Sequence, residues 1–451
     1  MSDSTLFRFA TAGSVDDGKS TLVGRLLHDS KAILADQLEQ VARTSAERGF
    51  GGEPGAIDFA LLTDGLRAER EQGITIDVAY RYFSTGRRSF ILADCPGHVQ
   101  YTRNMVTGAA TADAVVVLVD ARKGVLEQTR RHLAVVQLLR VPHVVVAVNK
   151  IDLLGYDEAA FQAVATDVSA LARDLGLPEA HVIPVSALAG DNIVERSANT
   201  PWYDGPSLLE LLETLPSLDE LESELEALRM PVQLVIRPQG ALAHDVDDTE
   251  SYRDYRAFAG RIASGTVRVG DEVAVFPGGA TTVVTGIDAG HVSLESASAP
   301  QSVSLRLADD LDAARGAVIA ASGSLPAPRR ELEASVFQLD PRPLAPGARV
   351  LVKSGTQTVQ ALVTAVRGRR DLTTLALEPT DHLEANDIGQ VELRLAAELA
   401  VEPYADHRRA GAFLVIHPQD GATLAAAIVT DPAASATATP ARTATTEGAA
   451  A

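Results

Sequence analysis

The stretch GSVDDGKS, residues 13–20, decides the fold of the first part of this chain. It matches G-x-x-x-x-G-K-[ST], a loop whose backbone N–H groups converge on the phosphates of a nucleotide. In that pattern Lys19 reaches the β- and γ-phosphate oxygens, and the hydroxyl of Ser20 binds Mg²⁺. The apolar run FRFATA precedes the loop and the helical run KSTLVGRLL follows it, which is the strand–loop–helix setting that the motif needs. We therefore predict a nucleoside triphosphate site.

Short apolar runs alternate with helical patterns through residues 1–216. The runs SFILAD, AVVVLVDA, HVVVAVNK and HVIPVSA lack strict apolar–polar alternation, which indicates strands that are buried on both faces. Helical stretches such as EQTRRHLAVVQLLR lie between them. Because this alternation is typical of βαβ units, we predict an α/β P-loop domain with a parallel sheet over residues 1–216.

The sequence NKID, residues 149–152, indicates which base is bound. It follows the apolar run HVVVAV directly, so Asp152 is expected just beyond a strand end. The carboxylate of Asp152 would accept hydrogen bonds from the ring N–H and the exocyclic amine of guanine. Adenine offers neither group there and would leave the carboxylate unpaired, a penalty that gives discrimination on the order of 10⁴-fold. Together with the phosphate loop, this motif predicts GTP.

Two further segments complete the predicted phosphate site. Asp94 ends the run SFILAD and is expected to hold Mg²⁺ through water. Gly97 would turn its N–H toward the γ-phosphate, and His98 would lie beside the attacking water, with a solvated loop histidine as the alternative. Thr75, in the run REQGITI, would close over Mg²⁺ and the γ-phosphate when GTP is bound. Such hydrolysis depends on positioning and charge stabilisation.

Cys95 is the only cysteine of the chain, which excludes an internal disulfide and a cysteine-based metal cluster. It follows Asp94 inside the predicted phosphate site. We predict a small buried residue at this position, and a redox role is the alternative.

Charge and hydropathy limit the partners and the location of the protein. The formal net charge of −20 argues against a nucleic-acid partner, because phosphate neutralisation needs clustered Lys and Arg. The N-terminal run MSDSTLFRFA lacks the pattern of a secretory signal. No apolar run approaches the roughly 18 residues of a membrane helix. We therefore expect a soluble, cytoplasmic protein.

The sequence pattern changes after residue 216. The acidic run SLDELESELEAL predicts a helical linker within residues 217–230. From residue 231 onward, short strand-like runs such as VQLVIRP, DEVAVFPGG and TTVVTGID alternate with Gly, Asp and Pro, which predicts small β-barrels. The break at SGSLPAPRRE divides them into barrel domains over residues 231–325 and 326–430.

Two segments are expected to stay outside the packed domains. The polar, acidic insertion within residues 240–258 predicts a long solvated loop. Residues 431–451 are almost wholly Ala, Thr and Pro and contain too few large apolar side chains to pack. We predict a disordered tail there.

The motifs and their order resemble those of the translation-factor GTPases, typified by elongation factor Tu. This resemblance extends to about residue 430 and implies a GTPase domain followed by two β-barrels. Four stretches are more similar to the large, GTP-hydrolysing subunits of bacterial sulfate adenylyltransferases: SVDDGKSTLVGRLLHDS, TDGLRAEREQGITIDVAYRYFST, GHVQYTRNMVTGA and DARKGVLEQTRRH. Asp17 and the YRYF run are characteristic of those subunits.

The finer resemblance implies that GTP hydrolysis drives the formation of adenosine 5′-phosphosulfate and pyrophosphate from ATP and sulfate. The adenylyl transfer would take place on a smaller catalytic subunit, in a heterodimer or a larger assembly. GTP and Mg²⁺ are the implied cofactors, and neither nucleic acid nor a membrane is expected as a partner. Some relatives carry a fused adenylylsulfate kinase domain with a second P-loop. The sequence holds no second such motif, so that activity is not expected.

The predicted site residues fall into three sets, and the resemblance adds to them the loop that contacts guanine from its other side. The catalytic set is His98, Lys19 and Thr75. The metal-binding set is Ser20, Thr75 and Asp94. The nucleotide-binding set is Gly13, Ser14, Val15, Asp16, Asp17, Gly18, Lys19, Ser20, Thr21, Asp94, Cys95, Pro96, Gly97, His98, Asn149, Lys150, Asp152, Ser186, Ala187 and Leu188.

Two other functions remain open from the sequence. A translation factor that delivers or releases RNA predicts a basic surface on the second and third domains. Residues 231–430 instead carry acidic runs such as HDVDDTESYRD and HLEANDIGQVE, although ALVTAVRGRRD is locally basic. A free-standing regulatory GTPase would carry the same motifs.

Overall fold

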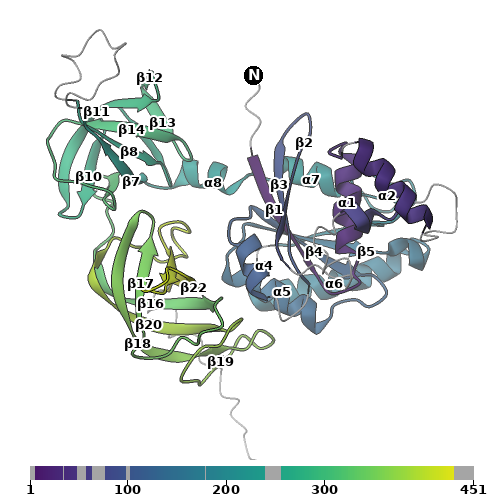
Figure 1. Cartoon of the computed structure of the whole chain (residues 1–451). Coiled ribbons are helices and arrows are strands. Elements are labelled where there is room, and N and C mark those ends of the chain that lie inside the picture. The colour runs from purple at the N-terminus through teal and green to yellow at the C-terminus, as the bar shows by residue number, and fades with distance from the viewer. Residues whose placement is uncertain are drawn as a thin grey trace, which may run out of the picture. The chain divides into compact units, whose positions relative to one another are not determined.

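The computed structural model describes residues 6–33, 35–47, 57–62, 77–97, 102–177, 179–238 and 255–430. The chain divides into two compact units. The first is Met1–Glu222 with Arg370–Ala376, and the second is Ser223–Arg369 with Leu377–Ala451. Figure 1 shows that the first unit carries a sheet with helices, whereas the second is built of strands.

A six-stranded sheet in the order β2-β3-β1-β4-β5-β6 forms the centre of the first unit. Neighbouring strands run parallel, except that β2 pairs with β3 in the antiparallel sense. The predicted parallel sheet is therefore confirmed, with one antiparallel edge strand. The strand bounds are β1 Leu6–Gly13, β2 Ala79–Ser84, β3 Ser89–Asp94, β4 Ala114–Asp120, β5 His143–Asn149 and β6 His181–Pro184.

Helices cover both faces of this sheet (Figure 1). Leucine side chains of α1 and α7 pack on the face that carries Phe7, Phe9 and Phe90, so this core is apolar and aromatic. None of the described helices has the length and apolar character that a membrane span needs. The helix bounds are α1 Lys19–Asp29, α2 Ala35–Glu47, α4 Thr102–Ala109, α5 Glu127–Leu138, α6 Glu158–Leu175 and α7 Leu208–Thr214, with 3₁₀ turns η1 Phe59–Leu62 and η3 Ile151–Leu154.

The acidic run after residue 216 forms helix α8, Leu218–Leu225, which confirms the helix predicted there. Its first turn is held to the sheet by Asp113, whose Oδ1 accepts from the N–H of Leu218 at 2.7 Å. The other oxygen of Asp113 accepts from the N–H of Arg8 at 2.6 Å. One buried carboxylate therefore joins β1 to the start of α8.

The first barrel of the second unit contains six strands in the order β10-β15-β7-β8-β14-β11, closed by the pairing of β10 with β11. Alternate residues such as Met230, Phe258, Ile287 and Leu305 fill its interior. The bounds are β7 Arg229–Ile236, β8 Ala257–Arg261, β10 Glu272–Phe276, β11 Ala280–Ala289, β14 Ser302–Leu307 and β15 Val318–Ala321, with β12 Val292–Leu294 beside β11 and the separate pair β9 Thr266–Arg268 and β13 Ser296–Ser298.

The second barrel contains six strands in the order β17-β21-β22-β16-β20-β18, closed by the pairing of β17 with β18. Val336, Val352, Val391 and Phe413 lie in its core. The bounds are β16 Arg329–Gln338, β17 Arg349–Ser354, β18 Gln357–Arg370, β20 Ile388–Leu399, β21 Ala412–Ile416 and β22 Thr423–Val429, with β19 Leu377–Glu378 beside β18.

The two β-barrels expected from the strand-like runs are confirmed, while the domain bounds at residues 216, 230, 325 and 430 stay predictions. The tail 431–451 lies outside the described residues, as does the part of the acidic insertion before residue 255.

Candidate nucleotide-binding site

The carboxyl ends of the parallel strands meet at one edge of the first unit's sheet. The register pairs Thr11 of β1 with Asp94 of β3, and Asp120 of β4 with Asn149 of β5. The loop after β6 joins the same edge, because Val148 of β5 pairs with the last residue of β6. Ligands of open α/β sheets bind outside the carboxyl ends of the strands. Every described residue of the predicted nucleotide set follows or ends one of these strands.

The phosphate loop runs from the end of β1 to the start of α1 and is shaped by its glycines. Gly18 has a φ of +92°, a conformation that L side chains rarely adopt. A Cβ on Gly18 would also overlap the side-chain amide of Asn149. The carbonyl of Gly18 accepts from the N–H of Leu22 at 2.9 Å and so begins the helix. Glycine is thus required here by both conformation and close approach.

Asp17 closes the phosphate loop from inside. Its Oδ2 accepts from the N–H of Ser14 at 2.8 Å, and the side chain is 1% exposed. Burial raises the pKa of this carboxyl above its usual value, although the bond from Ser14 opposes the change. The Oδ1 of Asp17 and the Oγ of Ser14 are buried without a hydrogen-bond partner among the described residues. The loop therefore contains two polar atoms without a hydrogen-bond partner among the described residues, which is expected where a polar ligand binds.

Lys19 lies buried under the phosphate loop, with Nζ 3.3 Å from the carbonyl oxygen of Gly13. Burial lowers the pKa of its amine, while the nearby carboxylates of Asp94 and Asp17 oppose the change. Gly97 packs directly against this pair. A Cβ on Gly97 would overlap the carbonyl oxygen of Gly13 and lie 2.6 Å from Nζ of Lys19. The segment after β3 therefore meets the phosphate loop where no side chain fits.

Asn149 joins three segments of the site. Its Nδ2 donates to the carbonyl of Asp17 at 2.8 Å, and its Oδ1 accepts from the N–H of Ala187 at 2.9 Å. The side chain is 1% exposed, so both bonds are shielded from water. Asn149 thus fixes the phosphate loop relative to the Ser186–Leu188 loop.

Lys150 and Asp152 follow Asn149, and their side chains make different contacts. Lys150 Nζ donates to the carbonyl of Asp16 and lies 3.1 Å from Oδ2 of Asp120. Asp152 is half-buried in the turn η3, and none of the described residues forms a hydrogen bond with its carboxylate. Lys150 therefore braces the phosphate loop, and the Asp152 carboxylate is left for another group.

The Ser186–Leu188 loop is held by its own backbone and by helix α1. The Oγ of Ser186 accepts from the N–H of Ala189 at 3.1 Å, and Arg25 Nη1 donates to the carbonyl of Leu188 at 3.2 Å. The side chain of Leu188 is 54% exposed. This loop presents an apolar side chain to the solvent from a fixed backbone.

Asp94 and Cys95 end β3 beside Lys19. The Oδ1 of Asp94 accepts from the hydroxyl of Thr11 at 2.8 Å, and the residue is 2% exposed. Cys95 is fully buried, which confirms the prediction of a small buried residue. Burial raises the pKa of its thiol well above the usual range, so the thiolate is disfavoured.

His98 and Thr75 lie outside the described residues. The third metal-binding residue of the prediction and the residue assigned to the attacking water therefore stay predictions from the sequence. Pro96 and Gly97 are the last described residues before that gap.

Asp120, Arg122 and Gln128 lie at this edge and were not assigned to the site, although the run DARKGVLEQTRRH contains all three. Asp120, at the end of β4, accepts from Arg122 Nη2 at 2.6 Å in addition to Lys150. Burial alone would raise the pKa of Asp120, but hydrogen bonds from Arg122 and Lys150 bring it below its usual range. Gln128 of α5 donates to the carbonyl of Gly97 at 3.0 Å. Asp120 could have been found as the last residue of AVVVLVD, at the same edge as NKID.

Comparison with family models places two parts of the chain. Residues 4–222 match the model of the Elongation factor Tu GTP binding domain, and residues 331–430 match the model of the GTP-eEF1A C-terminal domain-like family. A solved structure, sup35 complexed with GDP, aligns with 96% of this chain at 23% identity and a TM-score of 0.42, a likeness too weak to bear on function.

Curated relatives match nearly the whole chain. Sulfate adenylyltransferase subunit 1 of Methylorubrum populi is 49% identical over 97% of this chain and 90% of the relative. The corresponding protein of Alteromonas mediterranea is 43% identical over 94% of this chain and 87% of the relative. The Bifunctional enzyme CysN/CysC of Mycobacterium tuberculosis is 48% identical over 94% of this chain, which spans 67% of that relative.

Proposed function

Because the chain belongs to the family of sulfate adenylyltransferase subunit 1, we propose that its hydrolysis of GTP drives sulfate activation on a separate catalytic subunit. The similarity over 97% of the chain is the observation that carries this proposal. Cys95, the only cysteine, is a buried free thiol, in keeping with the cytoplasmic location that we propose.

The first step of the proposed function is the recognition of GTP. The backbone N–H groups of the phosphate loop and Lys19 would hold the phosphates, with Lys19 reaching the β- and γ-oxygens. Asp152 would pair with guanine, because its half-buried carboxylate has no hydrogen bond among the described residues. Asn149 supports both contacts by tying the phosphate loop to the Ser186–Leu188 loop.

Magnesium is part of the proposal, and the donor chemistry of the site fits it. Asp94 supplies a buried carboxylate that Thr11 orients, and Ser20 supplies a hydroxyl from the first turn of α1. Mg²⁺ prefers oxygen ligands and is held by one or two carboxylates together with substrate phosphates. Asp94, Ser20 and Thr75 would hold the ion, which when bound neutralises charge on the phosphate oxygens.

His98 would orient the water that attacks the γ-phosphate. It follows Gly97, which lies against the carbonyl of Gly13 and the amine of Lys19. Gln128 holds the carbonyl of Gly97 from the other side at 3.0 Å. The backbone of Gly97, which precedes His98 in the chain, is thus held at the phosphate loop. Positioning of this kind is the main contribution of a protein to phosphoryl transfer.

The partner and the coupling complete the proposal. A smaller catalytic subunit would form adenosine 5′-phosphosulfate and pyrophosphate from ATP and sulfate, a reaction that is uphill because its product is a mixed anhydride. Coupling requires each subunit to respond to the ligand state of the other. The GTPase rate should therefore depend on ATP, sulfate and the partner.

The test combines this chain with its candidate partner and measures GTP hydrolysis and adenosine 5′-phosphosulfate formation in the same reaction. We expect the GTPase rate to rise when ATP, sulfate and partner are all present, and product formation to stop when GTP is withheld. If the GTPase rate stays the same after ATP, sulfate and partner are added, the proposed coupling is refuted, but the proposed binding of GTP is not.

A further inference from the structure

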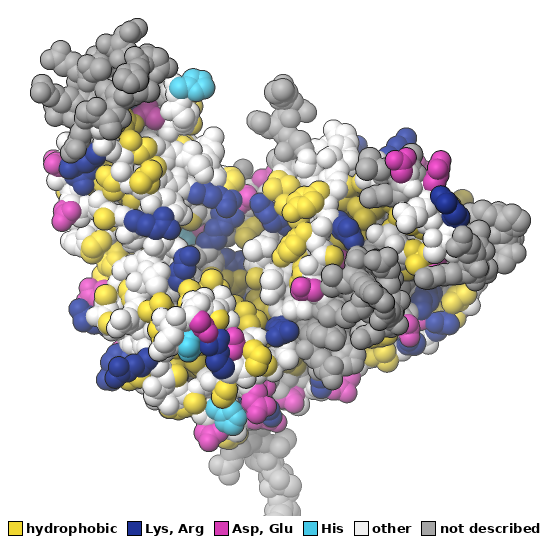
Figure 2. Space-filling view, viewed as in Figure 1, with side chains coloured by type: hydrophobic (Ala, Val, Ile, Leu, Met, Phe, Trp, Pro, Cys, Tyr) yellow, Lys and Arg dark blue, Asp and Glu magenta, His cyan; other side chains and the backbone are white. Residues whose placement is uncertain are grey.

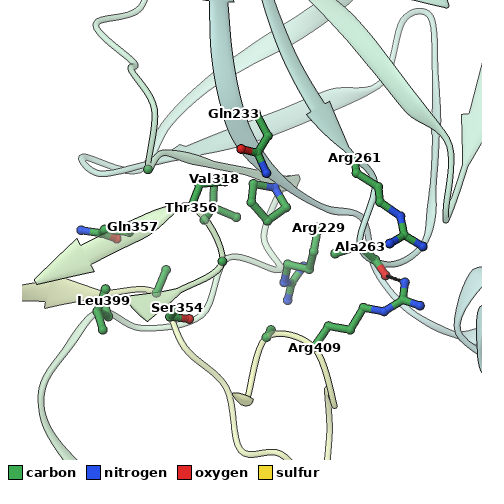
Figure 3. A pocket seen from close by; sticks show the side chains of 15 residues that line it. Arg229, Gln233, Arg261, Ala263, Val318, Ser354, Thr356, Gln357, Leu399 and Arg409 are labelled. Carbon is green, nitrogen blue, oxygen red and sulfur yellow. Dashed lines mark hydrogen bonds between the residues drawn. The ribbon is translucent and has the colours of Figure 1, made fainter. Parts of the chain in front are cut away.

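A cavity of about 240 Å³ lies between the two barrels of the second unit (Figure 3). Strands β7 and β8 line it from the first barrel. The turn between β17 and β18, the end of β20 and the segment that includes Arg409 line it from the second barrel. We call it the inter-barrel cavity. All of its residues belong to the same compact unit.

The two barrels meet closely beside this cavity at two glycines. A Cβ on Gly355, at the turn between β17 and β18, would lie 3.5 Å from the ring of Pro231. A Cβ on Gly316 would lie 3.5 Å from the Cα of Gln357. The walls of the cavity are therefore held at ordinary contact distance by the packing of the barrels.

Arg229 frames the cavity, and its hydrogen bonds are all made within the protein. Its guanidinium forms two hydrogen bonds with Glu402, at 2.9 and 2.7 Å. The other N–H groups donate to the carbonyls of Leu228 and Ser324 and to the Ser324 hydroxyl. A guanidinium has five N–H donors, and these five hydrogen bonds use all of them. Arg229 is therefore fully occupied in joining the barrels.

Arg261 and Arg409 bring two further positive charges to one side of the cavity. Arg261 Nε donates to the carbonyl of Pro300 at 3.1 Å, and Arg409 Nη1 donates to the carbonyl of Ala263 at 2.9 Å. Figure 3 shows both guanidinium groups beside Ala263, and Figure 2 shows Lys and Arg side chains gathered where the barrels meet. In the described part of the chain, none of the 15 residues lining the cavity is acidic. This runs against the formal net charge of −20.

Thr356, at the turn between β17 and β18, provides a polar group that lacks a partner. It lines the cavity and is 9% exposed, and its Oγ1 is buried without a hydrogen-bond partner among the described residues. Buried hydroxyls are rarely left in that state, because the loss of hydrogen bonds to water is not compensated. Because Thr356 lines the cavity, a rotation of its side chain about χ1 would bring the hydroxyl to a ligand oxygen there and supply the missing partner.

We propose that the inter-barrel cavity binds a small organic oxyanion, namely a carboxylate or a phosphate or sulfate monoester with a compact apolar body. Arg261 and Arg409 would attract the anionic group, and Thr356 would donate to one of its oxygens. Val318, Leu399 and Pro231 line the cavity and would contact the apolar body. The volume corresponds to about eight waters at roughly 30 Å³ each, so the body is about the size of one aromatic ring. Binding here requires neither GTP nor the catalytic subunit.

The first experiment titrates the full chain by calorimetry with phenyl phosphate, phenyl sulfate and benzoate. We expect at least one of these three probes to bind at a single site, about tenfold more tightly than inorganic phosphate, while benzyl alcohol does not bind. The three probes separate the carboxylate from the ester chemistries. If no probe binds, or if inorganic phosphate binds as tightly as the best probe, the proposal is overturned.

The second experiment locates the binding with variants. Arg409→Gln, and independently Arg261→Gln, should weaken the best probe about tenfold, whereas the matched change Arg268→Gln, at an exposed position of β9, should leave it unchanged. Equal loss in Arg268→Gln, or no loss in both cavity variants, would contradict the site.

Thr356→Val separates binding from folding. Because the hydroxyl has no partner in the described structure, replacing it by a methyl group should leave the melting temperature unchanged or raise it. The same change should weaken the best probe about fivefold. A variant that melts earlier, or that binds the probe as the unmodified chain does, would refute the assignment of Thr356.

Discussion

The phosphate-loop site, around Gly13–Ser20, and the inter-barrel cavity differ in how the chain assembles them. The first is made of short segments that each end or follow a strand of one parallel sheet. The second takes Arg261, Thr356 and Arg409 from three separate segments of two barrels. A site of the first kind is visible as local motifs, because the sheet topology alone brings the segments together. A site of the second kind depends on how two domains pack.

The largest effect is expected at the phosphate-loop site, where we assign His98 to the reacting water. His98→Ala should slow GTP hydrolysis by about 10³-fold and leave GTP affinity nearly unchanged, because His98 is assigned to the attacking water and not to ground-state binding. Single-turnover hydrolysis and equilibrium binding of GTP measure the two quantities separately. A large loss of affinity would mean that His98 has another task.

The matched prediction for the barrels concerns the pair that frames the cavity. Arg229→Met removes the main partner of a buried ion pair and leaves Glu402 with the contact to His407 Nε2 at 3.3 Å. Loss of one partner typically costs about 3 kcal/mol or more. We expect the thermal transition of the second unit, followed by circular dichroism, to move down by several degrees.

Two controls define what Arg229→Met measures. Arg268→Met, at an exposed position of the first barrel, should shift the transition little. Adding Glu402→Gln to Arg229→Met should recover part of the loss, because it removes a buried charge that has lost its arginine partner and keeps only His407 beside it among the described residues. If the double variant is no more stable than Arg229→Met, the charge of Glu402 is not the cause of the loss.

Substitution of Asp152 tests whether the NKID motif by itself identifies guanine as the bound base. Asp152→Asn should weaken GTP binding by about 100-fold, because the amide cannot accept both hydrogen bonds from guanine. The same variant should tolerate xanthosine triphosphate better, since the 2-oxo group suits an amide donor. Asp167→Asn, at an exposed position on α6, is the matched control. Unchanged preference between the two nucleotides would contradict the assignment of Asp152.

Sequence patterns predicted the sheet, both barrels and most segments at the phosphate edge, because each depends on residues that are adjacent in the chain. They missed Asp120 and Gln128, whose contacts depend on which strand and helix are neighbours in space. They also gave no sign of the cavity, because the unpartnered hydroxyl of Thr356 follows from the way one turn packs against another barrel. Local motifs therefore report a site only where the fold itself aligns them.

Gln128 and His132 of α5 belong to the run DARKGVLEQTRRH, but the sequence assigned neither of them a role at the phosphate-loop site. Gln128 Nε2 lies 3.0 Å from the carbonyl of Gly97 and 3.1 Å from Nε2 of His132. Because the amide donates to both, the hydrogen-bond network assigns His132 a neutral ring with an accepting Nε2. Burial, with a smaller contribution from Lys19, lowers the pKa of His132 to about 3.

The smallest effect we predict follows from this histidine. The unfolded chain protonates His132 near its ordinary pKa of about 6.5 while the folded chain does not, so folding stability is complete above that pH and falls as the pH drops toward 3. Between pH 6.5 and 5.5 the loss should be about 1 kcal/mol.

Urea unfolding followed by the fluorescence of Trp202, the only tryptophan, measures the first unit. His132→Gln should remove this part of the slope, whereas His181→Gln, at an exposed position, should not. Identical pH slopes for the unmodified chain and His132→Gln would show that burial in α5 does not change the protonation of His132. The helix would then make no contribution to the pH dependence of folding.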